Sequence, residues 1–569
     1  MAGLRRAGWA GLRCGVVEHM KTRGAAGPTS PESRTAAVPR TSLAGSAGLV
    51  SIATFLSRIG GLVREQLFAS LMGAGFYSDA FVVAFRIPNL LRDLLAEGAL
   101  STAFVPTFTQ RLLQGGSKDA YQLGNLVLTT LLVVTGGIAL VGGLLASPLV
   151  SLIAPGFAVT AGKLELTVFL TRILFPFLPM IALAAVLMGM LNAQHKFFVP
   201  ALAPALFNVA AIAVGLVLFG LHVAAPSAVL WWAIAVLLGG LVQFAIQIPP
   251  LYRAGWRYRP LFRPRFDDPG LRQILRLMVP AFVGLSATQV NILVNNVLAS
   301  QLEQGSPSWI NYAFRLMQLP IGVFGVAVAT VNLASVSRSA AAGDMREFRN
   351  TLAASLKLVA FLTLPATAGL VALREPIIAL LYEHGRFTAH DTAQTAAVLS
   401  AYAIGLYAYA SVKVLAPAYY ALQKPRIPLY ASLLAVSCNI VTSLALYRTL
   451  HAPGLALGTS LGALANFGLL LVVFTRRYGG LGGMGVGSQI LRVAIASAVM
   501  GAACRGLSQL LDQRFPGTGV ARDAIVTLPP VAVGVALYFA LSWVLRVEET
   551  HQGLRMLRRF ASRLGLRRA

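Results

Sequence analysis

Apolar stretches of about 20 residues recur along the chain from residue 43 to residue 546, and each is long enough for a helix to cross ~30 Å of hydrocarbon. Of the 569 residues, 56% are hydrophobic and 12% are charged, and the mean hydropathy is +0.71. Soluble proteins carry roughly 25% charged residues. The sequence therefore predicts an all-α membrane protein that crosses the bilayer many times.

The apolar stretches and the breakers between them predict about fourteen transmembrane helices. These lie near residues 43–70, 76–97, 122–147, 166–192, 199–220, 227–252, 272–301, 308–336, 351–373, 393–422, 427–448, 454–475, 488–510 and 524–546. Lysine and arginine gather in alternate loops, whereas SLMGAGFYS (70–78) and GLHVAAPS (220–227) hold neither. Because cytoplasmic loops are enriched in basic residues, we expect both termini in the cytoplasm.

One basic loop divides the chain. The segment YRAGWRYRPLFRPRFDDPGLRQILR carries seven arginines, from Arg253 to Arg276. Six predicted spans precede it, six follow and two remain, which suggests two six-helix lobes around a central cavity plus two C-terminal helices. The predicted segments are a disordered basic extension (1–41), the first lobe (42–252), a basic cytoplasmic loop (253–271), the second lobe (272–477), two additional helices (478–546) and a basic cytoplasmic tail (547–569).

Charged residues also occur inside the first two apolar spans, where a charge near the bilayer centre costs a few kcal/mol. In the first span, Arg58 and Arg64 flank a Gly-Gly pair and have only Glu65 as an acidic neighbour. Intramembrane charges usually face a water-filled cavity or a partner. An arginine pair with too little negative charge around it favours an anionic ligand, because the guanidinium matches phosphate or carboxylate geometry. The alternative is that these side chains snorkel to the interface.

Four charged residues of the second span fall near one face of a helix: Asp79, Arg86, Asp93 and Glu97. Arg92 is predicted to point away from this face, toward another helix. We predict that the face lines a cavity in which carboxylates hold arginines in place. Two alternatives remain open: Arg92, Asp93 and Glu97 are ordinary residues of the cytoplasmic interface, and Asp79 lies at the outer interface.

The second half of the chain holds fewer intramembrane charges. Arg315 lies in a span broken by Pro320, and Lys413 is the lone charge of AYAIGLYAYASVKVLAPAYYALQ. Either could be a structural counter-ion. Isolated cations that converge on one cavity instead indicate a functional site.

Several function classes are disfavoured by the sequence. The net charge of +27 would suit nucleic acid, but most arginines lie in short loops between apolar spans, where they set orientation. Cys14, Cys438 and Cys504 are scattered without the spacing of a disulfide framework or a metal site. No phosphate-binding glycine loop, HExxH motif or nucleophile elbow is present. We therefore expect no enzymatic activity, no metal and no cofactor.

The run SRIGGLVREQLFASLMGAGFYSDAFVVAFRIPNLLRDLLAEGALSTAFVPTF (57–108) closely resembles the start of the bacterial lipid II flippases called MurJ or MviN, a family of the multidrug/oligosaccharidyl-lipid/polysaccharide exporter superfamily. The resemblance extends over residues 42–546 and includes APGF (154–157), FPF (175–177), LNA (191–193), SWINYAFRLMQLPIGVFGVA (308–327) and VKVLAPAYYA (412–421). It implies two lobes in a V shape, a cationic cavity, two extra helices that form a groove for a lipid tail, and a place in the bacterial cytoplasmic (inner) membrane.

The resemblance also carries over individual residues. The family's essential charged residues match Arg58, Arg64, Asp79, Arg92, Glu97 and Arg315. Two positions depart from the family pattern: Phe314 stands where an acidic residue is usual, and Gln318 replaces a frequent glutamate. Arg315 therefore lacks its usual neighbours.

Lipid II carries a diphosphate between a disaccharide-pentapeptide and a polyprenyl tail, and that charge cannot cross hydrocarbon unaccompanied. We expect Arg58, Arg64 and Arg315 to bind the diphosphate. The residues expected to set cavity electrostatics and gating are Asp79, Arg86, Arg92, Glu97 and Lys413. Expected partners are lipid II, membrane lipids and the cell-wall synthesis machinery, and no nucleic acid. Alternatives are an exporter of another polyprenyl-linked oligosaccharide, a membrane transferase and a scaffold without transport activity.

Overall fold

The computed structural model describes residues 40–94, 100–260 and 267–551. The chain divides into two units, Met1–Ala47 and Gly48–Ala569. Only the beginning of the first helix represents the first unit among the described residues, so the predicted extension over 1–41 lies almost wholly outside them. The predicted basic tail lies outside them from residue 552 onward.

The described residues form helices joined by short turns, and no strand occurs among them. The first half contains α1 (Arg40–Met72), α2 (Phe76–Arg92), α3 (Ser101–Leu144), α4 (Ala146–Ile153), η2 (Pro155–Val159), α5 (Lys163–Leu174), α6 (Phe177–Ala193), α7 (Phe198–Gly220), α8 (Ala225–Ala245), α9 (Ile248–Arg253) and α10 (Pro269–Ser300).

The second half continues in the same way. It contains α11 (Ser306–Pro320), η3 (Ile321–Gly325), α12 (Val326–Ala341), α13 (Met345–Ala372), α14 (Arg374–Tyr382), α15 (Ala389–Ala403), α16 (Leu406–Ala421), α17 (Arg426–Tyr478), η4 (Gly482–Met484), α18 (Val486–Arg514) and α19 (Val520–Val544).

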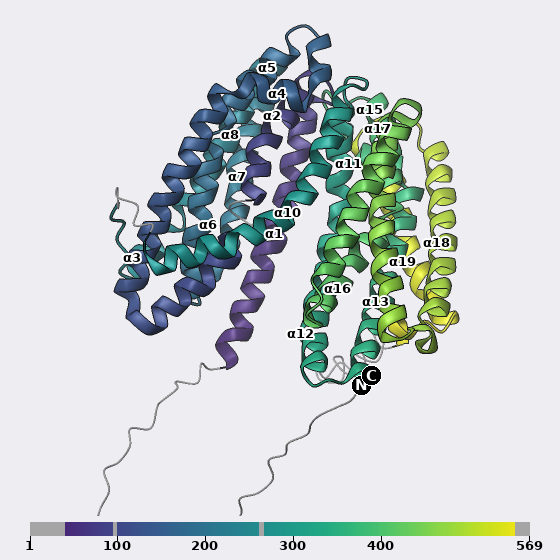
Figure 1. Ribbon diagram of the computed structural model, residues 1–569. Coiled ribbons are helices and arrows are strands. Elements are labelled where there is room, and N and C mark those ends of the chain that lie inside the picture. Colours follow the sequence, from purple (N-terminus) through teal and green to yellow (C-terminus); the bar gives the residue numbers. More distant parts are fainter. Residues whose placement is uncertain (1–39, 95–99, 261–266, 552–569) are drawn as a thin grey trace, which may run out of the picture. The chain divides into compact units, whose positions relative to one another are not determined.

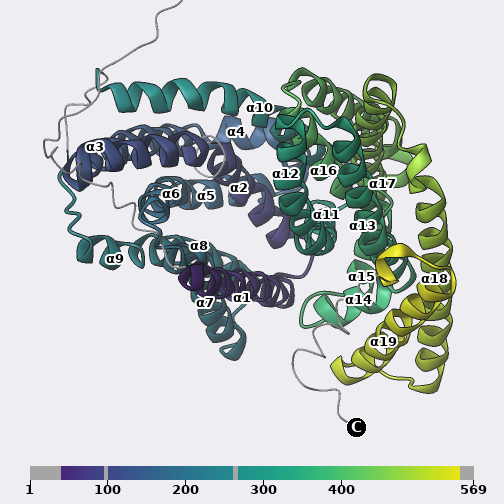
Figure 2. The ribbon, with the colours of Figure 1, turned by 90° about the horizontal axis from the view of Figure 1, so that it is seen from below.

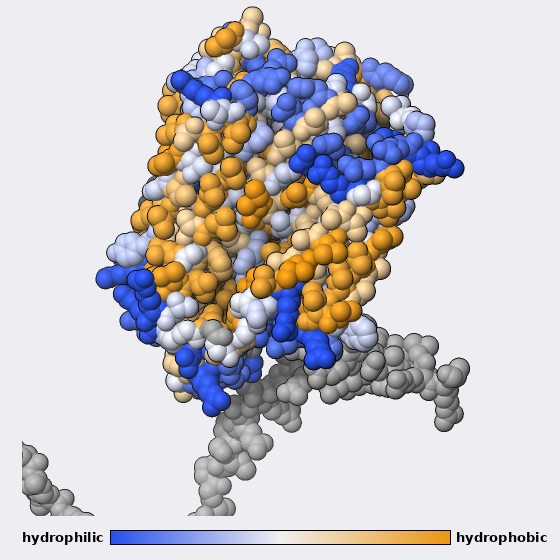
Figure 3. Space-filling model, turned by 90° about the vertical axis from the view of Figure 1, so that its right-hand side faces the viewer, coloured by the Kyte–Doolittle hydropathy of each residue, from blue (hydrophilic) through white to orange (hydrophobic). Residues whose placement is uncertain are grey.

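Eight helical segments of the described chain are long and apolar enough to cross a membrane. They are Thr102–Leu144, Lys163–Ala193, Phe198–Gly220, Ala225–Arg253, Met345–Ala372, Arg426–Tyr478, Val486–Arg514 and Val520–Val544. The pair α15 and α16, bent by 41°, is a ninth candidate. Figure 3 shows a broad apolar band on the surface between two hydrophilic ends, as a bilayer requires. The prediction of an all-α, multi-pass membrane protein is confirmed.

Two of the long helices are broken internally. The backbone of α3 leaves helical geometry at Gly116, with φ 75°, and that of α17 does so at His451, with φ 52°, two residues before Pro453. A span needs about 20 residues, so the 53 residues of α17 are long enough for two. The breaks lie where loops between predicted spans were expected.

Within the unit Gly48–Ala569, the helices pack in two groups (Figures 1 and 2). One group contains α1 to α9 and the other α11 to α17, while α10 packs on α3 in the first and on α17 in the second. The last two helices cover the second group from outside, with α18 against α13 and α19 against α14. This grouping positions α1 and α2 opposite α11.

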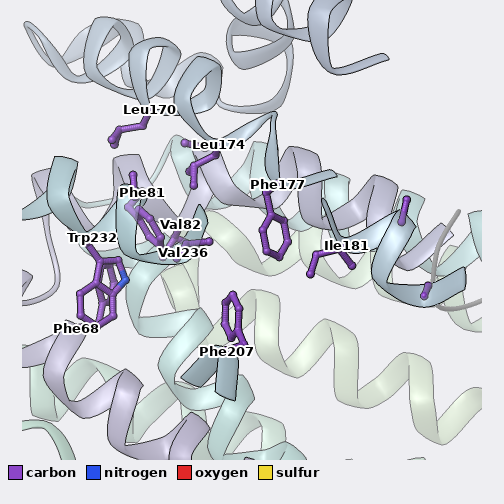
Figure 4. Close-up of a cluster of buried hydrophobic side chains, with 14 of the residues drawn as sticks. Phe68, Phe81, Val82, Leu170, Leu174, Phe177, Ile181, Phe207, Trp232 and Val236 are labelled. Carbon is purple, nitrogen blue, oxygen red and sulfur yellow. The ribbon is translucent and has the colours of Figure 1, made fainter. Parts of the chain in front are cut away.

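Aromatic side chains fix α1 and α2 within the first group (Figure 4). The ring of Phe68 on α1 lies 5.0 Å from that of Phe81 on α2 and 5.4 Å from that of Trp232 on α8. Phe177 on α6 lies 6.0 Å from Phe207 on α7. Tilted aromatic pairs at these distances add to the burial energy of the rings. Charged residues one turn away on α1 and α2 are thereby held on rigid elements.

A neutral polar cluster fixes α10 against α17 in the second group. The buried amide of Asn439 donates hydrogen bonds to Asn291 and Asn295 of α10, the latter at 3.2 Å. Asn295 donates to Thr459 at 3.1 Å, and Ser443 donates to Asn439 at 3.2 Å. Hydrogen bonds between helices satisfy polar groups that hydrocarbon cannot. Asn291 and Asn295 of α10 thus act in helix packing.

Candidate functional site

A cavity of about 570 Å³ lies where α1 and α2 face α11. Its lining consists of Arg58, Gly61, Leu62, Arg64, Glu65, Phe68, Phe81, Val82, Phe85, Arg86, Asn89, Arg92, Asp93, Phe207, Trp232, Val236, Gln289, Ile292, Asn311, Phe314, Arg315, Gln318, Leu319 and Tyr382. Most of these residues come from α1, α2 and α11, none of which is among the eight apolar spans of the described chain. Helices α2 and α11, with 17 and 15 residues, are shorter than a regular span, and both present charged residues to the cavity.

Five arginines line this cavity: Arg58, Arg64, Arg86, Arg92 and Arg315. Two carboxylates, Glu65 and Asp93, accompany them in the lining. The cavity wall therefore carries an excess of positive charge. Such a surface favours an anion.

Glu65 is the centre of the cavity's ion pairs, although only 6% of its side chain is exposed. Its carboxylate lies 3.5 Å from the guanidinium of Arg64 and 2.8 Å from Nε of Arg315. It also accepts a hydrogen bond of 3.1 Å from the amide of Asn311. Glu65 belongs to α1, whereas Arg315 and Asn311 belong to α11. This one carboxylate therefore joins the two helix groups.

Arg58 and Arg64 are held differently on α1. The guanidinium of Arg64 lies over the ring of Phe207, 5.2 Å from the ring centre, and only 13% of its side chain is exposed. Arg58 lies against Gly322 in η3, so closely that a methyl group at position 322 would overlap its Nη1 atom. Glycine at 322 thus leaves the room that the Arg58 side chain occupies. Arg315 is more accessible than Arg64, with 40% of its side chain exposed.

The charged residues of the second predicted span lie in two separate places, the cavity and the beginning of α2. Arg86, Arg92 and Asp93 line the cavity, and Arg92 forms an ion pair of 2.9 Å with Asp93. Arg92, expected to point away from the face of Asp79, Arg86 and Asp93, thus lines the same cavity as Arg86 and Asp93. Glu97 lies outside the described residues.

Asp79 lies outside the cavity lining and is completely buried at the beginning of α2. It forms an ion pair of 2.8 Å with Lys163 of α5, whose ammonium also lies 4.4 Å from the ring centre of Phe157. Asp79 also accepts hydrogen bonds from the backbone amides of Gly305 and Ser308 and from the hydroxyl of Ser308. The carboxylate thus binds the first turn of α11, where a helix favours negative charge.

Other contacts also join the two helix groups at the end of the molecule where Asp79 lies. The backbone amide of Arg386 donates to the carbonyl of Ser70 at 3.0 Å, and its guanidinium donates to the carbonyl of Leu71 at 3.1 Å. Tyr312 donates to the carbonyl of Gly73 at 3.1 Å. Gly73 has φ 67°, and a side chain there would overlap the backbone of Arg386. The turn between α1 and α2 therefore fits against the loop between α14 and α15.

The two departures from the resembled family both line the cavity. Phe314 packs edge-on against Tyr402, with ring centres 5.5 Å apart, and Gln318 faces the same space. The carboxylate partner of Arg315 is Glu65 of the other helix group, a residue that the sequence marked only as a neighbour of Arg64. Lys413 is exposed on α16 and is absent from the cavity lining.

A family model described as lipid II flippase MurJ matches residues 68–521. The chain belongs to the MurJ family of lipid II flippases. A probable lipid II flippase MurJ of Vibrio cholerae is 36% identical over 88% of this chain and 95% of its own length. The lipid II flippase MurJ of Burkholderia cenocepacia is 36% identical over 87% of this chain and 96% of its own.

Solved structures agree with membership of the MurJ family. A structure of lipid II flippase MurJ in an inward closed conformation matches with a TM-score of 0.72 at 27% identity and covers 87% of this chain and 98% of its own. An inward-facing multidrug resistance transporter of the MATE family matches with a TM-score of 0.63 at 15% identity and covers 75% of this chain and 96% of its own, which shows a shared fold. The resemblance predicted from residues 57–108 is confirmed.

Proposed function

We propose that this chain carries lipid II from the inner to the outer leaflet of the bacterial cytoplasmic membrane by alternating access, and that Arg58, Arg64 and Arg315 bind the diphosphate. The observation that supports this most directly is the collection of five arginines against two carboxylates in one cavity between two helix groups. A guanidinium offers a planar fork of donors that matches phosphate oxygens. The disaccharide-pentapeptide then occupies the polar cavity, while the tail stays in hydrocarbon.

The distribution of basic residues supports an orientation with both termini in the cytoplasm. Helices α11 and α12 run from Gly305, which binds Asp79, to an end that carries Arg338 and Arg346 (Figure 1). The loops at Arg253 and at Lys424 are basic in the same way. Positive charge marks the cytoplasmic side of short loops. The end closed by Asp79 is then the outer one.

The closed outer end supports alternating access as the mechanism. Asn311 is the first residue of α11 in the cavity lining, and it follows Ser308 by three positions, which is about 4.5 Å along a helix at 1.5 Å per residue. The cavity thus begins about one turn inside the contact of Asp79 with Ser308. Outward release of a headgroup requires these two residues to separate, while rocking of the two groups closes the inner side.

The test uses cells depleted of their own lipid II flippase and supplied with this chain. The measured quantity is the fraction of lipid II accessible to a probe added outside. We expect the wild-type chain to restore accessibility and Arg64→Ala and Arg315→Ala to abolish it, with all proteins present at equal amounts in the membrane. The matched control is Arg346→Ala, which removes an exposed arginine outside the cavity and should behave as wild type.

Three outcomes separate the possibilities. Full activity in Arg64→Ala or Arg315→Ala would remove that residue from the proposed diphosphate site. No restoration by the wild-type chain would favour another polyprenyl-linked oligosaccharide as the substrate. Restoration by the wild type and by both alanine variants would favour a scaffold role, in which the cavity charges are expendable.

A further inference from the structure

A second pocket, of about 490 Å³, lies beside the cationic cavity and is lined only by apolar residues. Its walls come from α2, α3, α4 and α10 and include Leu90, Leu91, Val141, Leu145 and Leu293. The volume lies within the usual range for small-molecule sites. We refer to it as the apolar pocket.

The apolar pocket and the cationic cavity share the wall formed by α2. Arg86, Arg92 and Asp93 of this helix face the cavity, whereas Leu90 and Leu91 face the apolar pocket. At 100° per residue these two sets occupy adjoining faces of one helix. An anion bound to Arg86 and Arg92 is therefore separated from the apolar pocket by less than the width of helix α2.

Helix α10 forms a second shared wall. Ile292 lines the cavity and the next residue, Leu293, lines the apolar pocket. Among the described residues, α10 packs more closely on α3, α4 and α17 than on α2. The seam between α2 and α10 is thus where the two spaces adjoin.

The apolar pocket also faces the surrounding lipid. Val141 of α3 is 53% exposed, and Leu145, which directly follows α3, is 51% exposed. These residues lie near the C-terminal end of α3, which leads to α4 and η2 at the outer end in the proposed orientation. The pocket therefore opens toward hydrocarbon of the outer leaflet.

We propose that the apolar pocket holds the first part of the substrate's polyisoprenyl tail while the diphosphate is in the cavity, an inference that rests on the proposed function. The tail is bonded directly to the diphosphate, so its first isoprene units must lie within a few bonds of the arginines. Apolar surface at that distance removes the tail from water, and each buried methylene contributes about 0.8 kcal/mol. A tail held here enters the outer leaflet before the headgroup leaves the cavity. The groove expected at 478–546 is a separate location for the distal tail.

The first test is photocrosslinking in vesicles that contain the full-length protein, lipid II and bulk phospholipid. A photoreactive amino acid replaces Val141, which lines the pocket, or, as a matched control, Leu140, which is 68% exposed and does not line it. We expect lipid II adducts at position 141 at least about tenfold more often than at position 140. Because the headgroup anchors the tail, Arg315→Ala should remove the adducts at position 141.

The second test fills the pocket. Gly137 lines it, and a side chain at this position would meet no atom within 4 Å, so Gly137→Leu should fold normally. Gly136 has the same open space and does not line the pocket, so Gly136→Leu is the matched control. We expect Gly137→Leu to weaken binding of long-tailed lipid II about tenfold, the loss from about two fewer buried methylenes. Binding of an analogue with a single isoprene unit should change much less, and Gly136→Leu should leave both unchanged.

The outcomes are distinct from those that test the proposed function. Adducts only with bulk phospholipid, equal lipid II adducts at positions 140 and 141, or unchanged binding in Gly137→Leu would each overturn the inference while wild-type flipping continues. Absence of flipping by the wild-type chain would instead overturn the proposed function. Preferential lipid II adducts at 141 together with tail-dependent weakening in Gly137→Leu would establish the site.

Discussion

Two carboxylates join α1 and α2 to α11, and they do so in opposite ways. Asp79 is fully buried, has one ammonium partner, Lys163, and accepts three further hydrogen bonds from Gly305 and Ser308. Glu65 lies in a cavity where five arginines face two carboxylates, and its partner Arg315 is 40% exposed. One site is matched and dry, whereas the other has surplus charge and access to water.

This difference in burial and charge indicates a structural role for Asp79 and a binding role for the arginines around Glu65. A buried carboxylate whose lone pairs all accept hydrogen bonds or an ion pair within the protein has no acceptor left for a ligand. Its interactions instead hold two helices together. A guanidinium that shares one carboxylate with another guanidinium retains free donors. The same type of residue, an acid on a helix beside α11, thus holds two helices together in one case and lies among surplus cations in the other.

The largest effect is expected for Asp79→Ala. This change leaves Lys163, which is 3% exposed, as a buried charge without its partner, and removing one member of such a pair costs about 3–5 kcal/mol. We expect a marked loss of thermal stability in detergent and of protein in the membrane. The double variant Asp79→Ala/Lys163→Met should recover part of that stability. A stable Asp79→Ala variant would show that this site is not the dry, matched pair described above.

The second-largest effect is expected for Arg64→Lys, and it should change substrate binding more than stability. Arg64→Lys keeps the charge but loses the planar fork, so we expect diphosphate binding to weaken about tenfold, equivalent to about 1.4 kcal/mol. The melting temperature should change little. Binding of lipid II to purified protein checks this, and affinity equal to that of wild type would mean that only charge, and not geometry, matters at this position.

Glu65→Gln sharpens the comparison because it removes negative charge from the site with surplus cations. Arg64 and Arg315 then lose their shared carboxylate, and we expect lipid II to bind about fivefold more tightly and to be released more slowly. Flipping should therefore fall although affinity rises. Weaker binding in this variant would mean that Glu65 positions the arginines more than it competes with the substrate.

The smallest effect is expected for Gly322→Ala. The added methyl group displaces the flexible end of Arg58, which can move at little cost to stability. We expect flipping to fall by about two- to threefold, comparable to the loss of less than 1 kcal/mol of binding. Gly325→Ala in the same π-helical segment adds a methyl group at an ordinary contact distance from Ala410 and does not touch the cavity, so it serves as the control.

Much of the fold and part of the site could be predicted from the sequence. Apolar stretches of span length predicted an all-helical membrane protein, and arginines inside such stretches predicted that Arg58, Arg64 and Arg315 face a cavity rather than lipid. The block from residue 57 to residue 108 was specific enough to identify the family. These are local properties, which the chain displays without its tertiary structure.

The ion pairs could not be predicted, because they join residues that are far apart in the sequence. Asp79 and Lys163 are separated by 84 positions, and nothing in the segment around Lys163 marks it as the partner of a buried acid. The ion pair of Glu65 with Arg315 bridges two helix groups in the same way.

The surplus of arginines in the cavity has an electrical consequence. Moving one elementary charge across a membrane potential of 100 mV changes the free energy by about 2.3 kcal/mol. An empty site that carries a net positive charge is drawn toward the negative cytoplasmic side, whereas a site filled by a diphosphate is closer to neutral and responds weakly. Under the alternating access proposed above, the potential of an energised cell would favour the inward-facing state of the unloaded protein and leave the loaded step almost independent of voltage.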